Sequence, residues 1–178
     1  MTLRPQDTNA SPAPRIAVAD LERGADAGAF IDLLDHYARD PMGGKKPLTA
    51  AVRASLIERL LQRNDFVAFI AFNGDTPCGL INCFEGFSTF AAAPLLNIHD
   101  LIVHADFRGR GVGRALLGAA EAEARRRGCC KLTLEVLSNN HTALATYERA
   151  GFRPYVLDPT AGHAQLLQKW LDTAPMQP

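Results

Sequence analysis

Hydrophobic and polar residues follow two different periods along the first half of the chain. Apolar residues recur at helical spacing in two segments, which predicts helices over about 25–38 and about 50–61, with Thr49 as the N-cap of the second. A weakly alternating segment, 15–20, comes before both helices and is a candidate first strand. An almost unbroken apolar run, 66–72, has the length of a buried strand.

The middle of the chain predicts a hairpin followed by a central strand. Asn73-Gly74 directly follows the run 66–72, and both residues tolerate a positive φ, so a returning antiparallel strand is expected over 78–84. Gly86 and Pro94 bracket a segment that we interpret as an irregular connection. The central strand then runs over 95–103.

A glycine-rich turn separates this central strand from an amphipathic helix. The turn contains Gly109, Gly111 and Gly113, and the helix after it ends in three arginines, 125–127, which we interpret as a solvated cluster at its negative end. A strand that leads through such a turn into a helix presents backbone N–H groups and the positive helix end to one point. That arrangement suits a phosphate.

The remaining pattern completes a mixed sheet. Residues 130–136 alternate and predict a strand parallel to 95–103, followed by a helix over 141–149 and a final strand pair over 152–157 and 165–171. The fold class is therefore α/β, a mostly antiparallel mixed sheet with one parallel strand pair and helices on both faces. We expect one domain over 15–172 between two tails, 1–14 and 173–178.

Composition narrows the class of protein. The 178 residues are 47% hydrophobic and carry 19 basic and 19 acidic side chains, so long-range attraction to nucleic acid or an anionic membrane is weak. No apolar run is long enough to span a bilayer and no signal peptide is visible, so a cytoplasmic protein is expected. The four cysteines lack metal-ligand spacing and are expected to be buried and reduced.

The glycine-rich turn matches neither of two common nucleotide-binding motifs. A dinucleotide fingerprint that begins at Gly109 needs glycine where Arg114 stands, and one that begins at Gly111 needs glycine where Leu116 stands. The Gly-Lys-Ser/Thr ending of a P-loop is also absent. A different phosphate-bearing cofactor is therefore indicated.

Two motifs resemble a known family. Arg108-x-x-Gly111-x-Gly113 resembles the acetyl-CoA signature of the GCN5-related N-acetyltransferase (GNAT) superfamily. Asn140, Ala143 and Tyr147, followed by Gly151-Phe152, match a second segment of that family at the correct separation. The resemblance covers about 95–154 and implies a GNAT-like fold with a splayed parallel strand pair, acetyl-CoA as donor, and no metal. It also implies acetyl transfer to an amine of a small molecule or a peptide. A homodimer is expected from the family resemblance alone.

The resemblance also implies where the cofactor binds. Backbone N–H groups of the turn would meet the pyrophosphate, the arginines would add local positive charge, and the central strand and Asn140 would contact the pantetheine arm. Asn140 could equally cap the helix that follows. The implied cofactor-binding residues are Leu101, Ile102, Val103, Arg108, Gly109, Arg110, Gly111, Val112, Gly113, Arg114, Asn140, Ala143 and Tyr147.

The expected reaction needs a proton acceptor, because freeing the lone pair of a lysine-like amine at neutral pH costs about 4–5 kcal/mol. The candidates are polar residues of the central strand, His99 and Asp100, with Glu85 as an alternative. Strand alternation places Asn97 and His99 on one face and Asp100 on the other. Family members often have an acidic residue at the position of His99, and structural roles for His99 and Asp100 remain open.

Tyr147 resembles the general acid of the family, which faces the departing thiolate. Transfer of a proton from an ordinary tyrosine to a thiolate is uphill by about 2 kcal/mol, so hydrogen bonding is the alternative role. The acceptor is expected between the first two helices and the second hairpin strand. The candidate acceptor residues are His36, Tyr37, Met42, Glu85 and Phe87, with Asp40, Lys45 and Lys46 close by.

The sequence therefore predicts direct attack of an amine on the thioester in a ternary complex, since no cysteine has a recognisable catalytic setting. A non-catalytic acyl-CoA-binding sensor or interaction module is the alternative. Such a module would keep the glycine-rich turn and could dispense with Tyr147 and with the polar residues of the central strand.

Overall fold

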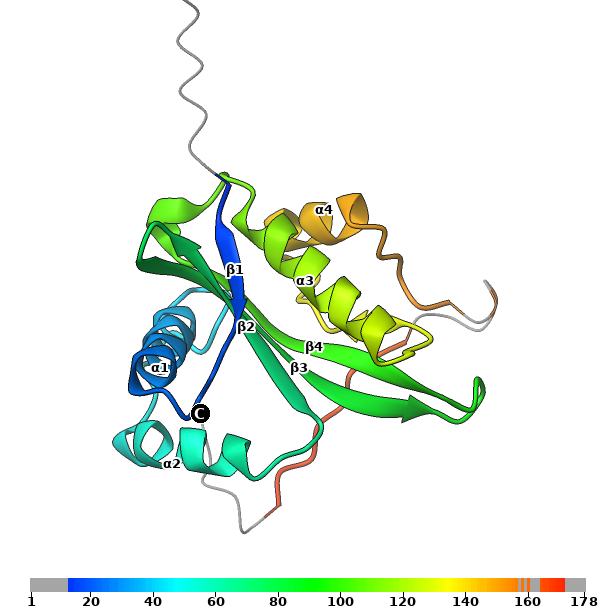
Figure 1. Cartoon of the computed structure of the whole chain (residues 1–178). Coiled ribbons are helices and arrows are strands. Elements are labelled where there is room, and N and C mark those ends of the chain that lie inside the picture. Colours follow the sequence, from blue (N-terminus) through cyan, green and yellow to red (C-terminus); the bar gives the residue numbers. More distant parts are fainter. Residues whose placement is uncertain (1–12, 157, 159, 161–163, 172–178) are drawn as a thin grey trace, which may run out of the picture.

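A twisted five-stranded sheet separates two layers of helices in the computed structural model, which describes residues 13–156, 158, 160 and 164–171 (Figure 1). One layer consists of α1 (Gly24–Ala38) and α2 (Ala50–Leu61), and the other of α3 (Val112–Arg126) and α4 (His141–Arg149). Thr49 caps α2, because its hydroxyl accepts a hydrogen bond from the N–H of Val52 at 3.3 Å. The four predicted helices are confirmed.

The strands follow one another across the sheet in chain order. They are β1 (Arg15–Val18), β2 (Phe66–Asn73), β3 (Thr76–Ser88), β4 (Ala93–Val103) and β5 (Leu132–Leu134). The first four pair antiparallel, and β5 pairs parallel to β4. The mostly antiparallel mixed sheet with one parallel pair is therefore confirmed, whereas β5 is shorter than the predicted strand 130–136.

Two predicted connections are tighter than expected. Asn73 pairs with Thr76, so the two-residue hairpin loop is Gly74-Asp75 rather than Asn73-Gly74, and Gly74 takes the positive φ of 60°. The irregular connection predicted between Gly86 and Pro94 is wrong, because pairing of β3 with β4 continues to Ser88 opposite Ala93. Cross-strand pairing extends both strands past the glycine and the proline.

The sheet divides the hydrophobic core into two clusters. Leu116 and Ala120 of α3 pack against β3 and β4, and both residues are fully buried. On the opposite face, Phe30 of α1 is 1% exposed and packs with Ile70 and Leu80. Each amphipathic helix therefore buries its apolar stripe on one side of the same sheet.

The predicted final strand pair is wrong for the residues that the structure describes. Residues 152–156 and 164–171 form no strand, and Leu157 lies outside the described residues. Leu166 and Leu167 are 78% and 84% exposed, so their apolar pattern is not used to pack against a partner. Strand propensity without a neighbouring edge does not produce a strand.

Among the described residues, no helix combines the length and the apolar character needed to cross a bilayer.

The three arginines at the end of α3 have different environments. Arg125 and Arg126 are exposed and pair with glutamates of their own helix, as a solvated cluster should. The prediction is wrong for Arg127, whose side chain is only 16% exposed and bridges Glu123 at 2.7 Å and Glu85 of β3 at 3.0 Å. Hydrogen bonds from Arg126 and Arg127 lower the pKa of Glu123 to about 2. Arg127 therefore ties the end of α3 to the sheet.

Replacement of Arg127 by alanine should destabilise the fold by about 2 kcal/mol, because charged hydrogen bonds to half-buried carboxylates are lost. For a chain of this length, that loss corresponds to a decrease in Tm of about 4–8 °C. Arg125→Ala is the matched control and should change the free energy of unfolding by less than about 0.5 kcal/mol, since its ion pair is exposed. Thermal unfolding followed by circular dichroism measures both, and equal shifts would contradict the bridging role of Arg127.

Candidate active site

The glycine-rich turn joins β4 to α3 through a short helix, η1 (Ala105–Phe107). Gly109 and Gly111 adopt φ of 76° and 80°, and Gly111 is the N-cap of α3. A Cβ atom on either residue would meet no other atom within 4 Å, so glycine is needed there for its backbone conformation rather than for room. The first N–H groups of α3, like those of any helix, have no acceptor within the helix. Such a helix start favours an anion.

The three arginines of the turn and the start of α3 are engaged differently. The guanidinium of Arg108 donates to Asp40 Oδ2 at 2.8 Å and to the carbonyl oxygen of Val103 at 3.2 Å. Arg110 lies 5.4 Å from the centre of the Phe107 ring. Among the described residues, no carboxylate lies within 4 Å of Arg110 or Arg114. These two cations therefore keep their charge available to a ligand.

The parallel strand pair separates before β4 ends. β5 pairs only with Leu96, Asn97 and Ile98, and no strand of the described chain lies beside β4 from His99 to Val103 on that side. The backbone of Leu101, Ile102 and Val103 thus borders an open edge that leads directly into the turn. An extended ligand can hydrogen-bond to such an edge.

A β-bulge lies where the two strands begin to separate. Cys83 pairs with Ile98 and Asn82 with Asp100, so His99 is the extra residue in β4. The bulge turns both polar residues toward the α1 side: Asn82 Nδ2 donates to Asp100 Oδ2 at 2.8 Å, and the exposed His99 ring packs edge-on against Phe84. The predicted alternation of His99 and Asp100 is therefore wrong, because it assumed a regular strand.

Two tyrosines lie close enough to Asp100 for its charge to act on them. Burial raises the pKa of Tyr147 to about 12, and the neighbouring Tyr37 and Asp100 contribute in the same direction. Burial also raises the pKa of Tyr37, followed by the effects of Asp100 and Asp40. Both hydroxyls are therefore protonated donors at neutral pH. Tyr147 of α4 and Tyr37 of α1 thus both lie within electrostatic range of Asp100 of β4.

Asn140 sets the start of the helix that carries Tyr147. Its side-chain oxygen accepts a hydrogen bond from the N–H of Ala143 at 3.2 Å, as an N-cap does. This confirms the capping role that the sequence left open. Because α4 has only nine residues, its N-cap helps to fix where Tyr147 lies.

The predicted acceptor residues divide between two places. His36, Tyr37 and Met42 lie at and just after the end of α1, and the hydroxyl of Tyr37 donates to the carbonyl oxygen of Met42 at 3.3 Å. Glu85 is bound to Arg127 beneath α3, on the face of the sheet opposite to Asp100. Phe87 is 63% exposed near the end of β3. The structure thus places His36, Tyr37 and Met42 together at the end of α1. It leaves Glu85 and Phe87 apart from them.

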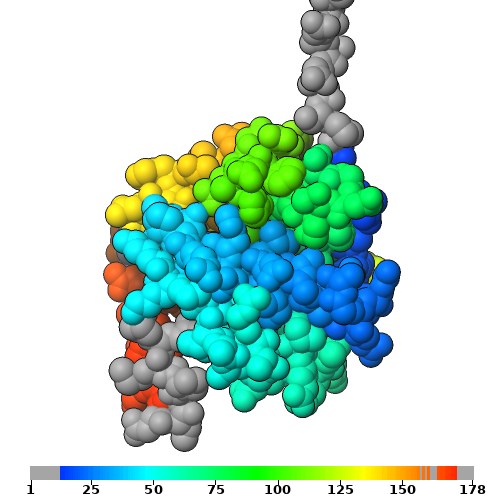
Figure 2. Space-filling model, turned by 90° about the vertical axis from the view of Figure 1, so that its left-hand side faces the viewer, coloured from blue at the N-terminus to red at the C-terminus, as the bar shows by residue number. Residues whose placement is uncertain are grey.

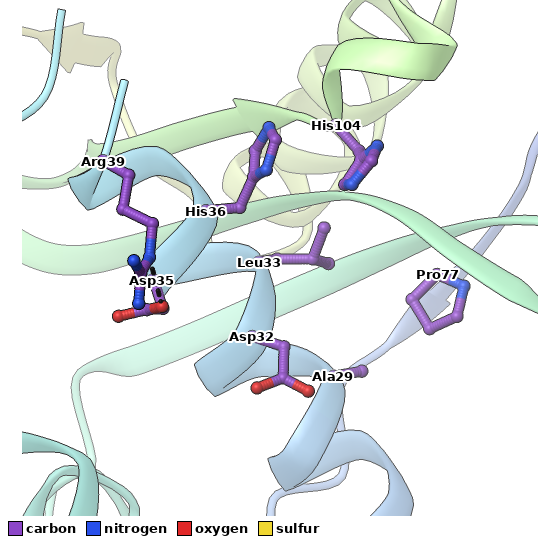
Figure 3. Close-up of a pocket in the computed structure, with 8 residues that line it drawn as sticks. All are labelled: Ala29, Asp32, Leu33, Asp35, His36, Arg39, Pro77 and His104. Atoms are coloured by element: carbon purple, nitrogen blue, oxygen red, sulfur yellow. Dashed lines mark hydrogen bonds and ion pairs between the residues drawn. The ribbon is translucent and has the colours of Figure 1, made fainter. Parts of the chain in front are cut away.

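A cavity of about 440 Å³ opens between α1, the start of β3 and the residue that follows β4 (Figure 3). His36 and His104 face each other there with ring centres 4.3 Å apart, and the N–H of Ala105 donates to His36 Nε2 at 3.3 Å. Burial lowers the pKa of His36, and the nearby His104 and Arg108 act in the same direction. Sequence reasoning missed His104, because its partner is 68 residues away and leaves no local signal.

A second cavity, of about 580 Å³, forms a groove along α3 toward the end of α4. Sequence reasoning did not identify it, since its lining comes from two helices and the start of β5. One carboxylate, Glu121, lies in the groove, and it is paired with Arg125. The basic side chains that line it are Arg114, Arg125, Lys131, Arg149 and Arg153.

Comparison with curated proteins finds a relative that matches part of the chain. An uncharacterized N-acetyltransferase of Methanocaldococcus jannaschii is 33% identical over 94 residues, which cover 52% of this chain. The matched part spans 42% of that relative, less than half of its length.

Solved structures share the fold. A transcriptional regulator of Bacillus halodurans superposes with a TM-score of 0.72 at 21% identity and covers 89% of this chain and 100% of that one. An aminoglycoside N-acetyltransferase in complex with CoA superposes with a TM-score of 0.67 at 13% identity, covering 90% and 97%. At these identities the likeness concerns the fold alone.

The sequence itself shows the family to which the chain belongs. The sequence model of the acetyltransferase (GNAT) family matches residues 30–152, which include the open edge of β4, the glycine-rich turn, α3 and α4. This match covers more than half of the chain and contains every element that borders the candidate site. The chain belongs to the acetyltransferase (GNAT) family.

Proposed function

We propose that the protein is an acetyl-CoA-dependent N-acetyltransferase that acts on an amine of a small molecule or a peptide. One observation carries the proposal: an open edge of β4 leads through η1 into a glycine-rich turn at the start of α3. This arrangement offers an extended arm a strand edge and offers a phosphate a helix start. Acetyl-CoA, the donor that the GNAT family uses, contains both an extended pantetheine arm and a pyrophosphate.

The donor would lie along this path. The backbone N–H groups of residues 109–113 bind the pyrophosphate, and the pantetheine arm pairs with the edge formed by Leu101, Ile102 and Val103. Asn140 and Ala143 border the arm from the start of α4. Arg110 and Arg114 contribute positive charge, and Arg114 continues into the basic groove beside α3. These interactions concentrate positive charge locally in a protein of zero net charge.

The bulge supplies the groups that handle the proton of the amine. We assign to Asp100 the binding of the acceptor ammonium, since Asn82 holds its carboxylate in place and its charge acts on both tyrosines. We assign to His99, the exposed residue next to it, the removal of the proton. Both side chains lie on the α1 side of the sheet, where His36, Tyr37 and Met42 border the acceptor.

Tyr147 stabilises the departing thiolate by hydrogen bonding in this proposal. With a pKa of about 12, full transfer of its proton to a thiolate of ordinary pKa is uphill by about 5 kcal/mol. A protonated phenol that points at a developing negative charge still stabilises it as a donor. The proton that ends on the thiol then comes from solvent.

Direct attack without an acetyl-enzyme agrees with the state of the cysteines. Cys78 and Cys83 are buried, and burial raises the pKa of both thiols, that of Cys83 to about 12. Burial also raises the pKa of Cys129. Cys130 is exposed, contrary to the expectation of four buried cysteines, and lines the basic groove beside α3. For Cys78, Cys83 and Cys129, burial therefore disfavours the thiolate that acyl transfer through the enzyme would need.

Acetyl-CoA should raise the Tm of the protein, because a ligand at 100 times its Kd adds about 2.7 kcal/mol to the free energy of unfolding. A panel of amino acids, polyamines, aminoglycosides and peptides should then release free thiol with at least one amine. Thermal shift and a thiol-reactive dye measure the two steps. Absence of any thermal shift would disprove the proposal, whereas a shift without thiol release from the whole panel would favour the acyl-CoA-binding sensor.

The variant Tyr147→Phe should lower kcat by about 10-fold to 100-fold, because one hydrogen bond to the thiolate is lost. The Kd for CoA should stay within about twofold, since the ring remains in place. Tyr155→Phe is the control, because Tyr155 is 59% exposed. Isothermal titration gives the Kd and thiol release gives kcat. If kcat is unchanged in Tyr147→Phe, the assigned role is wrong.

The two assignments at the bulge predict different pH profiles. In His99→Gln, the decrease of kcat/KM toward low pH that reports the base should disappear. In Asp100→Asn that decrease should remain, while KM for the amine rises about 10-fold because a charged hydrogen bond is lost. Initial rates measured from pH 5 to 9 distinguish the base role of His99 from the binding role of Asp100. The opposite pattern would exchange the roles of the two residues.

A further inference from the structure

The first arginine of the glycine-rich turn is already committed to protein partners. Arg108 donates from Nη2 to Asp40 Oδ2 at 2.8 Å and from Nε to the carbonyl oxygen of Val103 at 3.2 Å. Its side chain is 54% exposed, whereas that of Asp40 is only 18% exposed. Removal of the guanidinium would therefore leave a largely buried carboxylate without its cation, which is unfavourable.

Asp40 joins two parts of the molecule through one carboxylate. While Oδ2 accepts from Arg108, Oδ1 accepts from the backbone N–H of Met42 at 2.8 Å. The Met42 N–H and the Arg108 guanidinium both lower the pKa of Asp40, so the group is ionised at neutral pH. Asp40 thus connects the turn that we assign to the donor with residues 39–48, which we name the acceptor loop.

The acceptor loop is folded tightly against the end of α1. The N–H of Gly43 donates to the carbonyl oxygen of Asp40, and that of Lys46 donates to the carbonyl oxygen of Ala38. A Cβ atom on Gly43 would lie 2.1 Å from the carbonyl oxygen of Tyr37, so only glycine permits this contact of two backbones. The position of the loop is therefore coupled to that of Tyr37.

Tyr37 carries this coupling to the reaction centre. Its hydroxyl donates to the carbonyl oxygen of Met42, the residue whose N–H is bound by Asp40. Its ring lies close enough to Asp100 and Tyr147 to share their electrostatic effects. A continuous path of hydrogen bonds and packed groups thus runs from Arg108 through Asp40 and Met42 to Tyr37.

A second contact holds the same two parts together. His36, one turn before Asp40, accepts the N–H of Ala105 and stacks on His104, just ahead of the glycine-rich turn. Figure 2 shows the residues of this turn, in yellow-green, lying directly against α1 and the acceptor loop, in blue and cyan. The end of α1 is therefore fixed to the start of the turn at two points, of which only the Asp40–Arg108 pair is an ion pair.

We infer that Asp40 and Arg108 are positioning residues: their ion pair couples the glycine-rich turn to the acceptor loop, so that CoA bound at the turn also orders the loop and Tyr37. The inference rests on the proposed function, since it takes the turn as the CoA site. Arg108 keeps its carboxylate partner when CoA binds, because the pyrophosphate has the N–H groups of residues 109–113 and two other arginines for its charge. When CoA orders the glycine-rich turn, the acceptor loop therefore becomes more ordered as well.

Hydrogen–deuterium exchange of the full chain, with CoA itself as the probe, tests this coupling. In the unmodified protein, saturating CoA should slow amide exchange at 108–113 and also, by about threefold to tenfold, at 40–46. In Asp40→Asn, which keeps an oxygen for the Met42 N–H and removes the charge, CoA should still protect 108–113 but no longer 40–46. The Kd for CoA should change by less than about threefold.

Two control variants isolate the ion pair. Asp32→Asn removes an exposed carboxylate of α1 that pairs with Arg53 of α2, and it should behave like the unmodified protein. Arg110→Ala should weaken CoA binding yet retain protection of the loop at saturation, because Arg110 has no carboxylate partner in the described chain. If Asp40→Asn proves poorly folded, Arg108→Gln removes the same pair from the other side and should give the same result.

The outcomes separate the two levels of the proposal. If CoA fails to protect 108–113 in the unmodified protein, the proposed function itself is wrong. If CoA protects the turn without protecting 40–46, or if Asp40→Asn retains protection of the loop, the coupling is wrong. Faster exchange of the loop on addition of CoA would also overturn it, since Arg108 would then leave Asp40 for the phosphate.

Discussion

The early end of pairing between β4 and β5 is the constraint on which the rest of the site depends. A strand in the interior of a sheet normally satisfies its backbone groups on both sides, yet β4 loses its parallel neighbour after Ile98 and continues to Val103. The exposed edge is tolerable because the strand is short there and ends in the glycine-rich turn. Everything that we assign to the donor borders this edge or the turn that follows it.

The bulge at His99 works together with this separation. A regular β4 would have placed His99 and Asp100 on opposite faces, and only one could have reached the acceptor side. The extra residue instead directs both toward α1, where the charge of Asp100 acts on Tyr37 and Tyr147, while Ile98 remains in the core under α3. One inserted residue thus creates a polar cluster on the α1 side of the sheet. The α1 layer and the donor turn meet at the same cluster through Asp40 and Arg108.

The elements that could be predicted from sequence are those with local signals. Helical periodicity, the N-cap Thr49 and the glycines of the turn each act over a few residues, so α1, α2, α3 and the turn were predicted correctly. The failures share a different cause. The bulge, the burial of Arg127 and the Asp40–Arg108 pair depend on contacts between distant segments, which no local pattern encodes. The final strands had the correct propensity but no packed neighbour in the described chain, and propensity alone was insufficient.

The basic groove beside α3 has a consequence for how ligands reach the protein. Because the chain has equal numbers of basic and acidic residues, cations collected along the groove leave an excess of negative charge elsewhere on the molecule. The protein is therefore electrically polarised although it is neutral as a whole. An anionic ligand, such as the donor that we propose, would be drawn toward the groove. Added salt shortens the range of this field, so it would slow the arrival of such an anion.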